Sequence, residues 1–146
     1  LTRIAEDERV EEVTIWEINS TADLLQIGVE ELAAEIDAAD GNYDQAIAHL
    51  RRGVEIETSL NYDEPPPWGQ PVRRYLGAVL LEAGQPARAA QVYREDLDEF
   101  PANGWSLYGL TQALEAQGKA EEAAEVEERF EQAWQYADVE LDGSVF

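Results

Sequence analysis

"LGAVLLEAGQPARAAQVY", residues 76–93, is the stretch that decides the fold, because it describes two helices joined by a tight turn. Apolar residues recur at helical spacing up to Gly84, and a small residue, Ala89, follows five positions later. Glycine readily adopts the left-handed conformation that ends a helix, and alanine lets the next helix pack closely against the first. The stretch therefore predicts a helical hairpin.

The same pattern occurs twice more in the chain. Residues 33–50, "AAEIDAADGNYDQAIAHL", and residues 110–127, "LTQALEAQGKAEEAAEVE", each contain a Gly followed five residues later by an Ala. Gly84 and Gly118 are 34 residues apart. A fixed period of this kind indicates a repeat array, in which each hairpin buries its apolar face against the next.

In its period and its residues the chain resembles the tetratricopeptide repeat family over residues 27–137, and it is similar to uncharacterised bacterial members. The middle copy has the family pattern at Leu76, Gly77, Leu80, Gly84, Ala89, Tyr93 and Pro101. The outer copies depart from it, with Thr58 in place of the closing proline and Glu127 in place of a large apolar residue. Terminal repeats are often atypical. The resemblance implies an all-α fold, a right-handed α-solenoid of about three helical hairpins.

We expect one domain over residues 1–146, belonging to a larger protein because the chain does not begin with Met. Its predicted parts are a preceding helix or cap (1–26), repeat 1 (27–60), an insertion loop (61–69), repeat 2 (70–103), repeat 3 (104–137) and a tail (138–146). The predicted helices are 21–39, 44–58, 71–83, 86–99, 104–117 and 120–136. Residues 3–18 could form a further helix, although "VTIWEI" has a composition typical of strands. Ser20 or Thr21, and Asn103, are the expected N-caps.

The insertion "NYDEPPPWG", residues 61–69, separates the first two hairpins and accounts for the nine residues by which their spacing exceeds the period. Three consecutive prolines cannot join a helix interior and favour an extended conformation. We interpret the segment as a stiff spacer in which Trp68 packs, at least half buried, on the neighbouring hairpins. The alternative is a ligand site rimmed by Tyr62, Glu64 and Trp68.

The charge is strongly negative, with 32 acidic and 10 basic residues and a net charge of -22. Such a surface repels nucleic acid and anionic lipid, so we expect neither as a partner. No apolar run approaches the ~20 residues of a membrane span, which predicts a soluble chain. The compartment stays open, with the cytoplasm favoured. Because the acids are spread over the whole chain, we interpret them as general solubilisation, as in a salt-loving organism; attraction of a basic partner is the alternative.

The sequence contains no recognisable catalytic constellation. It has no Cys and one His, His49, and no phosphate-binding or nucleophile motif. Paired acids are so abundant that they indicate solvated helix surfaces rather than acid catalysis. We therefore predict a non-enzymatic protein with no catalytic residue, metal site or cofactor.

Placing the sequence on the family pattern puts six residues on the concave groove formed by the first helix of each hairpin: Glu31, Glu35, Arg74, Trp105, Tyr108 and Gln112. Aromatic residues and arginine commonly anchor peptides, although the two aromatics could equally be core. The family's lysine-rich carboxylate clamp is absent, since Arg74 alone is basic. The resemblance thus implies an interaction scaffold that binds a peptide or helix of another protein. Alternatives are a small-molecule or metal-binding sensor or enzyme accessory domain that uses the proline-rich loop, and self-association into a homo-oligomer.

Asp96 stands twelve residues after Gly84, where the family usually has a small residue facing the next hairpin. An acid at this place should be buried, and a buried carboxylate needs hydrogen-bond partners. We predict a structural contact with Arg73 or with the free backbone N–H groups of the helix that begins near Gly104.

Overall fold

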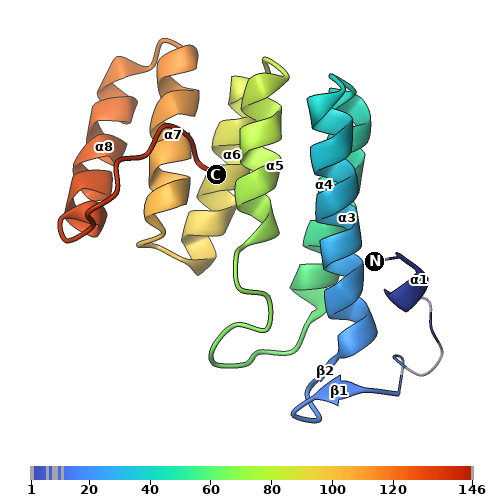
Figure 1. Cartoon of the computed structure of the whole chain (residues 1–146). Helices are drawn as coiled ribbons and strands as arrows, with labels where there is room; N and C mark the ends of the chain where they lie inside the picture. Colours follow the sequence, from blue (N-terminus) through green and yellow to red (C-terminus); the bar gives the residue numbers. More distant parts are fainter. Residues whose placement is uncertain (1, 6, 8–9, 11, 146) are drawn as a thin grey trace. The chain divides into compact units, whose positions relative to one another are not determined.

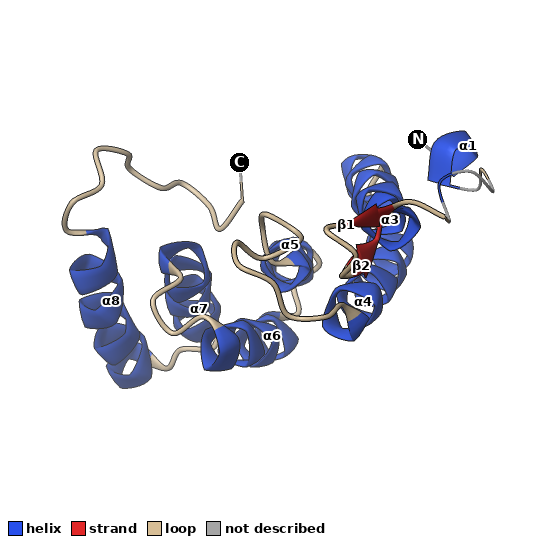
Figure 2. Ribbon diagram, turned by 90° about the horizontal axis from the view of Figure 1, so that it is seen from below, coloured by secondary structure: helices blue, strands red, loops and turns tan. Residues whose placement is uncertain are grey.

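The computed structural model describes residues 2–5, 7, 10 and 12–145, and it is all-α apart from one short hairpin of strands. The chain divides into two compact units, residues 1–72 and 73–146, each described below by itself. Unit 1 contains α1 (Thr2–Ala5), β1 (Thr14–Ile15), β2 (Asn19–Ser20), α3 (Thr21–Ala39) and α4 (Tyr43–Ser59) (Figure 1). Unit 2 contains α5 (Val72–Glu82, whose first residue belongs to unit 1), α6 (Pro86–Glu99), α7 (Gly104–Ala116) and α8 (Ala120–Trp134) (Figure 2).

The six predicted helices are confirmed, with ends that differ by no more than two residues. Ser20 is the N-cap of α3, and its side-chain oxygen accepts a hydrogen bond from the N–H of Ala22 at 3.2 Å. Asn103 is the N-cap residue of α7, but no side-chain capping bond is formed there. Its amide instead contacts other side chains, as described below.

The three hairpin turns share one backbone geometry. Gly41, Gly84 and Gly118 have φ of 79°, 69° and 72°, the left-handed region in which other residues are strained. Each N–H bonds the carbonyl three residues earlier, and the N–H of the next residue bonds the carbonyl five residues earlier, at 2.7–3.0 Å. Both bonds satisfy carbonyls that the end of a helix leaves without partners, which is the Schellman arrangement. The residue after each Gly is also the N-cap of the next helix.

The alanine five residues after each turn glycine lies in the interhelical contact. Ala46 and Ala89 are fully buried and Ala123 is nearly so. Around them the hairpins bury leucines and isoleucines at helical spacing: Leu24, Ile27, Ile47 and Leu50 in unit 1, and Leu76, Leu80, Leu97, Leu107, Leu110 and Leu114 in unit 2. The apolar period read from the sequence is therefore the core of each unit.

The helix expected over residues 3–18 is wrong for the residues that the structure describes. α1 covers Thr2–Ala5 and packs against α3, and the strand-like stretch forms the hairpin of β1 and β2, with Thr14 opposite Ser20. Trp16 and Glu17 occupy the turn with φ of 50° and 63°. Two successive residues at positive φ match the twist of an antiparallel pair, so the β propensity of "VTIWEI" outweighs its helical spacing.

The proline-rich insertion is a loop between α4 and α5 and is joined at its start to the strand hairpin. The N–H of Asn61 donates to Asn19 Oδ1 at 2.8 Å, and Asn19 Nδ2 donates to the Asn61 carbonyl at 3.0 Å. At its end, the N–H of Val72 donates to Glu57 Oε2 at 3.1 Å, which satisfies a free donor at the start of α5. A bilayer-spanning helix is absent from the described residues.

Candidate peptide-binding face

The candidate site of unit 2 is built around Tyr93, a fully buried residue of α6. Its ring lies against Gly77 of α5 and Gly109 of α7, and a Cβ at either glycine would overlap the ring. Glycine in a helix interior is unfavourable by about 1 kcal/mol relative to alanine, so two of them facing one ring indicate a packing requirement. The phenol therefore passes between α5 and α7.

The side chains around this seam define what we call the α5–α7 face: Arg74 and Gly77 of α5, and Trp105, Gly109 and Gln112 of α7. Within each helix they follow the three- and four-residue spacing of one surface. The guanidinium of Arg74 lies 5.0 Å from the centroid of the Trp105 ring and 5.1 Å from that of Tyr75. Both are cation–π distances, and the contact with Trp105 joins α5 to α7.

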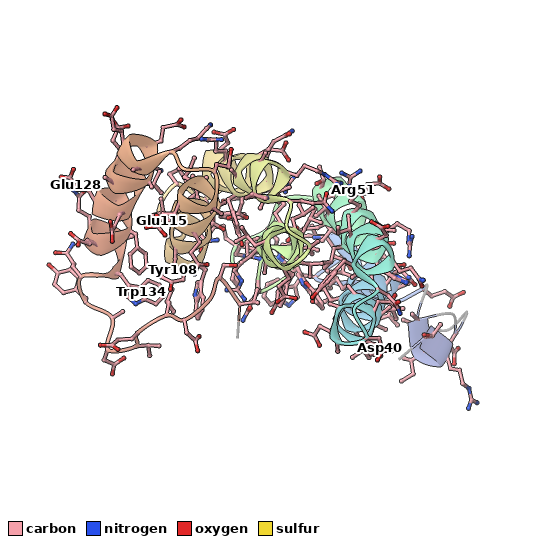
Figure 3. All side chains as sticks on the ribbon, turned by 90° about the horizontal axis from the view of Figure 1, so that it is seen from above. Asp40, Arg51, Tyr108, Glu115, Glu128 and Trp134 are labelled. Carbon is pink, nitrogen blue, oxygen red and sulfur yellow. The ribbon has the colours of Figure 1, made fainter. Side chains whose placement is uncertain are left out.

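Aromatic rings continue from Trp105 towards α8. Trp105 meets Trp134 edge to face with centroids 5.6 Å apart, and Phe130 lies 5.7 Å from Trp134 and 5.5 Å from Tyr108. Figure 3 shows Tyr108 and Trp134 between α7 and α8. Each of the four rings is only partly buried. The cluster thus combines core contacts with accessible aromatic surface, and the groove role of Trp105 and Tyr108 stays a prediction.

The chain after α8 returns across unit 2. Trp134 Nε1 donates to the carbonyl of Val139 at 2.7 Å, and the hydroxyl of Ser144 lies 2.5 Å from that of Tyr93. Ser144 is buried, with 3% of its surface exposed. Figures 1 and 2 show the tail, residues 138–145, crossing α7 on the side away from α6. It meets the Tyr93 hydroxyl where that group reaches the α5–α7 face.

Asp96 connects α6 to the start of α7. It is fully buried, as expected, and its Oδ2 accepts hydrogen bonds from the Ser106 hydroxyl at 2.6 Å and from Asn103 Nδ2 at 2.8 Å. The bonds found come from these side chains rather than from backbone N–H groups. Burial raises the pKa of Asp96, and the two hydrogen bonds and the charge of Arg73 oppose that rise. Arg73 itself pairs with Glu99 at 3.5 Å.

In unit 1 the predicted residues take different roles. The indole N–H of Trp68 donates to Glu31 at 3.1 Å, and Trp68 is more than half buried, as expected. Tyr62 is 81% exposed, and its hydroxyl donates to Glu64 at 2.5 Å. Trp68 thus attaches the loop to α3, while Tyr62 and Glu64 pair with each other. Glu35 is exposed on α3. A groove shared between Glu31 and Glu35 of unit 1 and the four residues of unit 2 stays a prediction.

Sequence reasoning missed a polar cluster between α3 and α4. Glu30, with 7% of its surface exposed, lies 2.7 Å from His49 Nδ1 and accepts from Arg52 Nε at 3.1 Å and from Gln26 at 2.9 Å. Burial acts to raise the pKa of Glu30, but these hydrogen bonds and the Arg52 charge outweigh it, so the pKa is lowered. His49 Nε2 is also 3.6 Å from Asp37. His49 thus lies among partners that its sequence neighbours do not reveal.

Comparison with known proteins gives one family. Residues 80–126, from the second half of α5 to the middle of α8, match the sequence model of the tetratricopeptide repeat. The matched residues make up about a third of the chain, which is similar to this family over that stretch. No curated protein matches it.

Two residues of the site were not predicted from the sequence. Gly109 was not singled out, and the tail residue Ser144 was given no role. A glycine in the middle of the apolar α7 was a usable signal, because it is unfavourable there without a packing reason. Nothing in the local sequence points from Ser144 to Tyr93. No group of three or more acidic or His side chains among the described residues is arranged to hold a metal ion.

Proposed function

We propose that the protein is a non-enzymatic interaction scaffold that binds an extended or helical segment of another protein on the α5–α7 face. Tetratricopeptide repeats generally mediate protein–protein interactions, and the matched residues include most of this face. The aromatic cluster is the observation on which the proposal rests. Four neighbouring rings are partly buried rather than enclosed in the core, and the buried Arg74 lies over one of them, Trp105.

These residue types suit a protein partner. Trp, Tyr and Arg are the residues most often found at binding hot spots, because they offer large contact area and directed polar groups. Arg74 is itself buried, and its guanidinium, 5.0 Å from the centroid of the Trp105 ring, supports that ring at the face. A peptide would therefore bind through apolar contacts with Trp105 and polar contacts with Gln112, both of which are partly exposed.

The experiment compares two Gln→Arg substitutions on opposite sides of unit 2. Gln112→Arg adds bulk and charge to the α5–α7 face, and Gln91→Arg makes the same change at an exposed position of α6. Partners would be isolated by cross-linking to the wild-type chain, and their affinity for each purified variant would be measured by calorimetry. We expect Gln112→Arg to weaken binding by about tenfold or more, as for the loss of ~1.4 kcal/mol, and Gln91→Arg to bind like wild type. Equal affinities for all three proteins would contradict the proposal.

A further inference from the structure

The tail is held at its two ends and is open between them. The carbonyl of Val139 accepts from Trp134, and Ser144 meets Tyr93, while Asp138, Glu140 and Asp142 are exposed. These three acids face solvent and belong to a chain whose net charge is -22. The two hydrogen bonds thus hold the tail at separate points, with exposed acids between them.

The contact with Tyr93 demands a particular kind of residue. The ring of Tyr93 is confined between two helices, and its hydroxyl meets Ser144 in a buried place. A buried hydroxyl without a partner costs free energy, so the residue opposite should supply a donor or an acceptor. Ser144 does so with a short side chain, and a long side chain would have to displace the tail from the seam.

The contacts of the tail resemble those of a peptide bound to a protein surface. An extended backbone crosses α7, one carbonyl is bound by an indole of the aromatic cluster, and one small hydroxyl is bound between two helices. A hydrogen bond to a backbone carbonyl can form whatever the residue, whereas the Tyr93 hydroxyl selects a residue that has a hydroxyl of its own. The α5–α7 face thus already contacts an extended segment of defined chemistry.

We infer that the tail is an intramolecular occupant of the α5–α7 face, and that a partner binds by replacing it with an extended segment that places a serine or another small hydroxyl residue against Tyr93. The inference rests on the proposed function for the identity of the face. It adds the chemical class of the ligand and a competition between the ligand and the chain's own tail.

The test uses the tail itself as the probe, so no natural partner is needed. A fluorescent peptide of residues 138–146, "DVELDGSVF", is titrated into proteins of residues 1–146, and binding is followed by anisotropy. Ser144→Arg introduces a long side chain and a charge near Arg74, which should expel the attached tail. Gln91→Arg also replaces a neutral residue by arginine, at an exposed position of α6, and it serves as the control.

We expect the peptide to bind Ser144→Arg at least about tenfold more tightly than it binds wild type or Gln91→Arg, because only the first protein has an unoccupied face. Ser144→Ala adds no bulk, so its affinity for the peptide should rise by less than that of Ser144→Arg. It provides the test if the arginine variant does not fold. A peptide carrying alanine in place of this serine should bind about tenfold more weakly, as expected for a buried hydroxyl that loses its partner.

Three results would overturn the inference. They are the absence of peptide binding by both Ser144 variants, equal binding by wild type and Ser144→Arg, and equal binding of the serine and alanine peptides. A wild-type dimer in light scattering that dissociates on Ser144→Arg would overturn the intramolecular assignment, because the tail would then occupy a second copy. If Gln112→Arg loses its affinity for the partner but the tail peptide binds none of the proteins, the proposed function stands and the role of the tail is rejected.

Discussion

At the scale of single residues, the unit 2 core contains one carboxylate that composition would place on the surface. Asp96 is fully buried, whereas the acidic residues of a protein, of which this chain has 32, are mostly exposed. Its cost is offset by short hydrogen bonds from Ser106 and Asn103, which place the start of α7 against α6. Its other oxygen, Oδ1, is buried without a hydrogen-bond donor among the described residues, in keeping with a raised pKa.

Substitutions of Asp96 test how much its hydrogen bonds between α6 and α7 contribute to the free energy of unfolding. Asp96→Ala should lower the free energy of unfolding by about 1–3 kcal/mol, because the buried Ser106 hydroxyl loses its acceptor. Asp96→Asn should cost less, since its carbonyl oxygen can still accept a hydrogen bond and the desolvated charge is removed. Urea unfolding of both variants would be compared with Asp98→Ala, an exposed position on the same helix that should change stability by less than about 0.5 kcal/mol. An Asp96→Ala protein as stable as its parent would refute the structural role.

Tyr93 shows how one residue serves both the fold and the proposed site. Its ring fills the space that Gly77 and Gly109 leave open, and its hydroxyl contacts Ser144. Burial raises the pKa of the phenol well above its ordinary value, so the hydroxyl keeps its proton at physiological pH. The core therefore presents a fixed hydrogen-bonding group at the α5–α7 face.

At the scale of elements, the hairpins are held by local turn chemistry and, between α3 and α4, by the charged cluster around Glu30. The pKa of Glu30 is lowered because His49, Arg52 and Gln26 stabilise its ionised form more than burial opposes it. A carboxyl whose pKa is lower in the folded than in the unfolded state stabilises the fold above its unfolded value. That contribution is lost as the pH falls through the folded-state pKa.

The lowered pKa of Glu30 predicts how its contribution to stability depends on pH. At pH 7 Glu30→Gln should be less stable than wild type, and the difference should shrink as the pH falls below the ordinary carboxyl pKa of 4.5. Denaturant unfolding at several pH values down to the acid limit of the fold gives the comparison. Glu55→Gln, at an exposed position of α4, is the matched control and should show no such convergence. A constant difference between Glu30→Gln and wild type at every pH would contradict the assignment.

At the scale of the whole molecule, the net charge of -22 is the dominant property. Only 10 basic residues are available to pair with the acids, and several ion pairs, such as that of Arg94 with Glu122 at 3.1 Å, are on the surface. Surface pairs contribute little, typically about 0–1 kcal/mol each. Repulsion among the remaining acids should therefore oppose the compact state.

Salt should reduce this repulsion. We expect the melting temperature to rise by at least about 3 °C between about 0.05 M and about 1 M sodium chloride, as for roughly 1 kcal/mol in a domain of this size. A variant with three exposed acids of α8 neutralised, Glu121→Gln, Glu125→Gln and Glu128→Gln, should gain less from salt. An unchanged melting temperature would mean that the acids are compensated locally.

The sequence by itself determined the helices, the turns and the repeat. These depend on local physics: a glycine at positive φ, a small residue five positions later, and apolar residues at helical spacing, all of which lie within one hairpin. The 34-residue period then implied stacking. The helix expected over residues 3–18 failed where β propensity and a tight turn competed with a weak helical pattern.

Only the tertiary structure decided which polar groups meet. Ser144 lies 51 residues from Tyr93, Glu30 lies 19 residues from His49, and the donors to Asp96 are side chains of the next helix. Such pairings depend on the packing angle of helices and on the course of the tail, which no local pattern encodes. The aromatic and arginine residues of the α5–α7 face were found from their family positions, whereas the tail that lies against it was not. A hydrogen bond between distant residues forms only after the core has placed both groups, so it appears in the fold and not in the sequence.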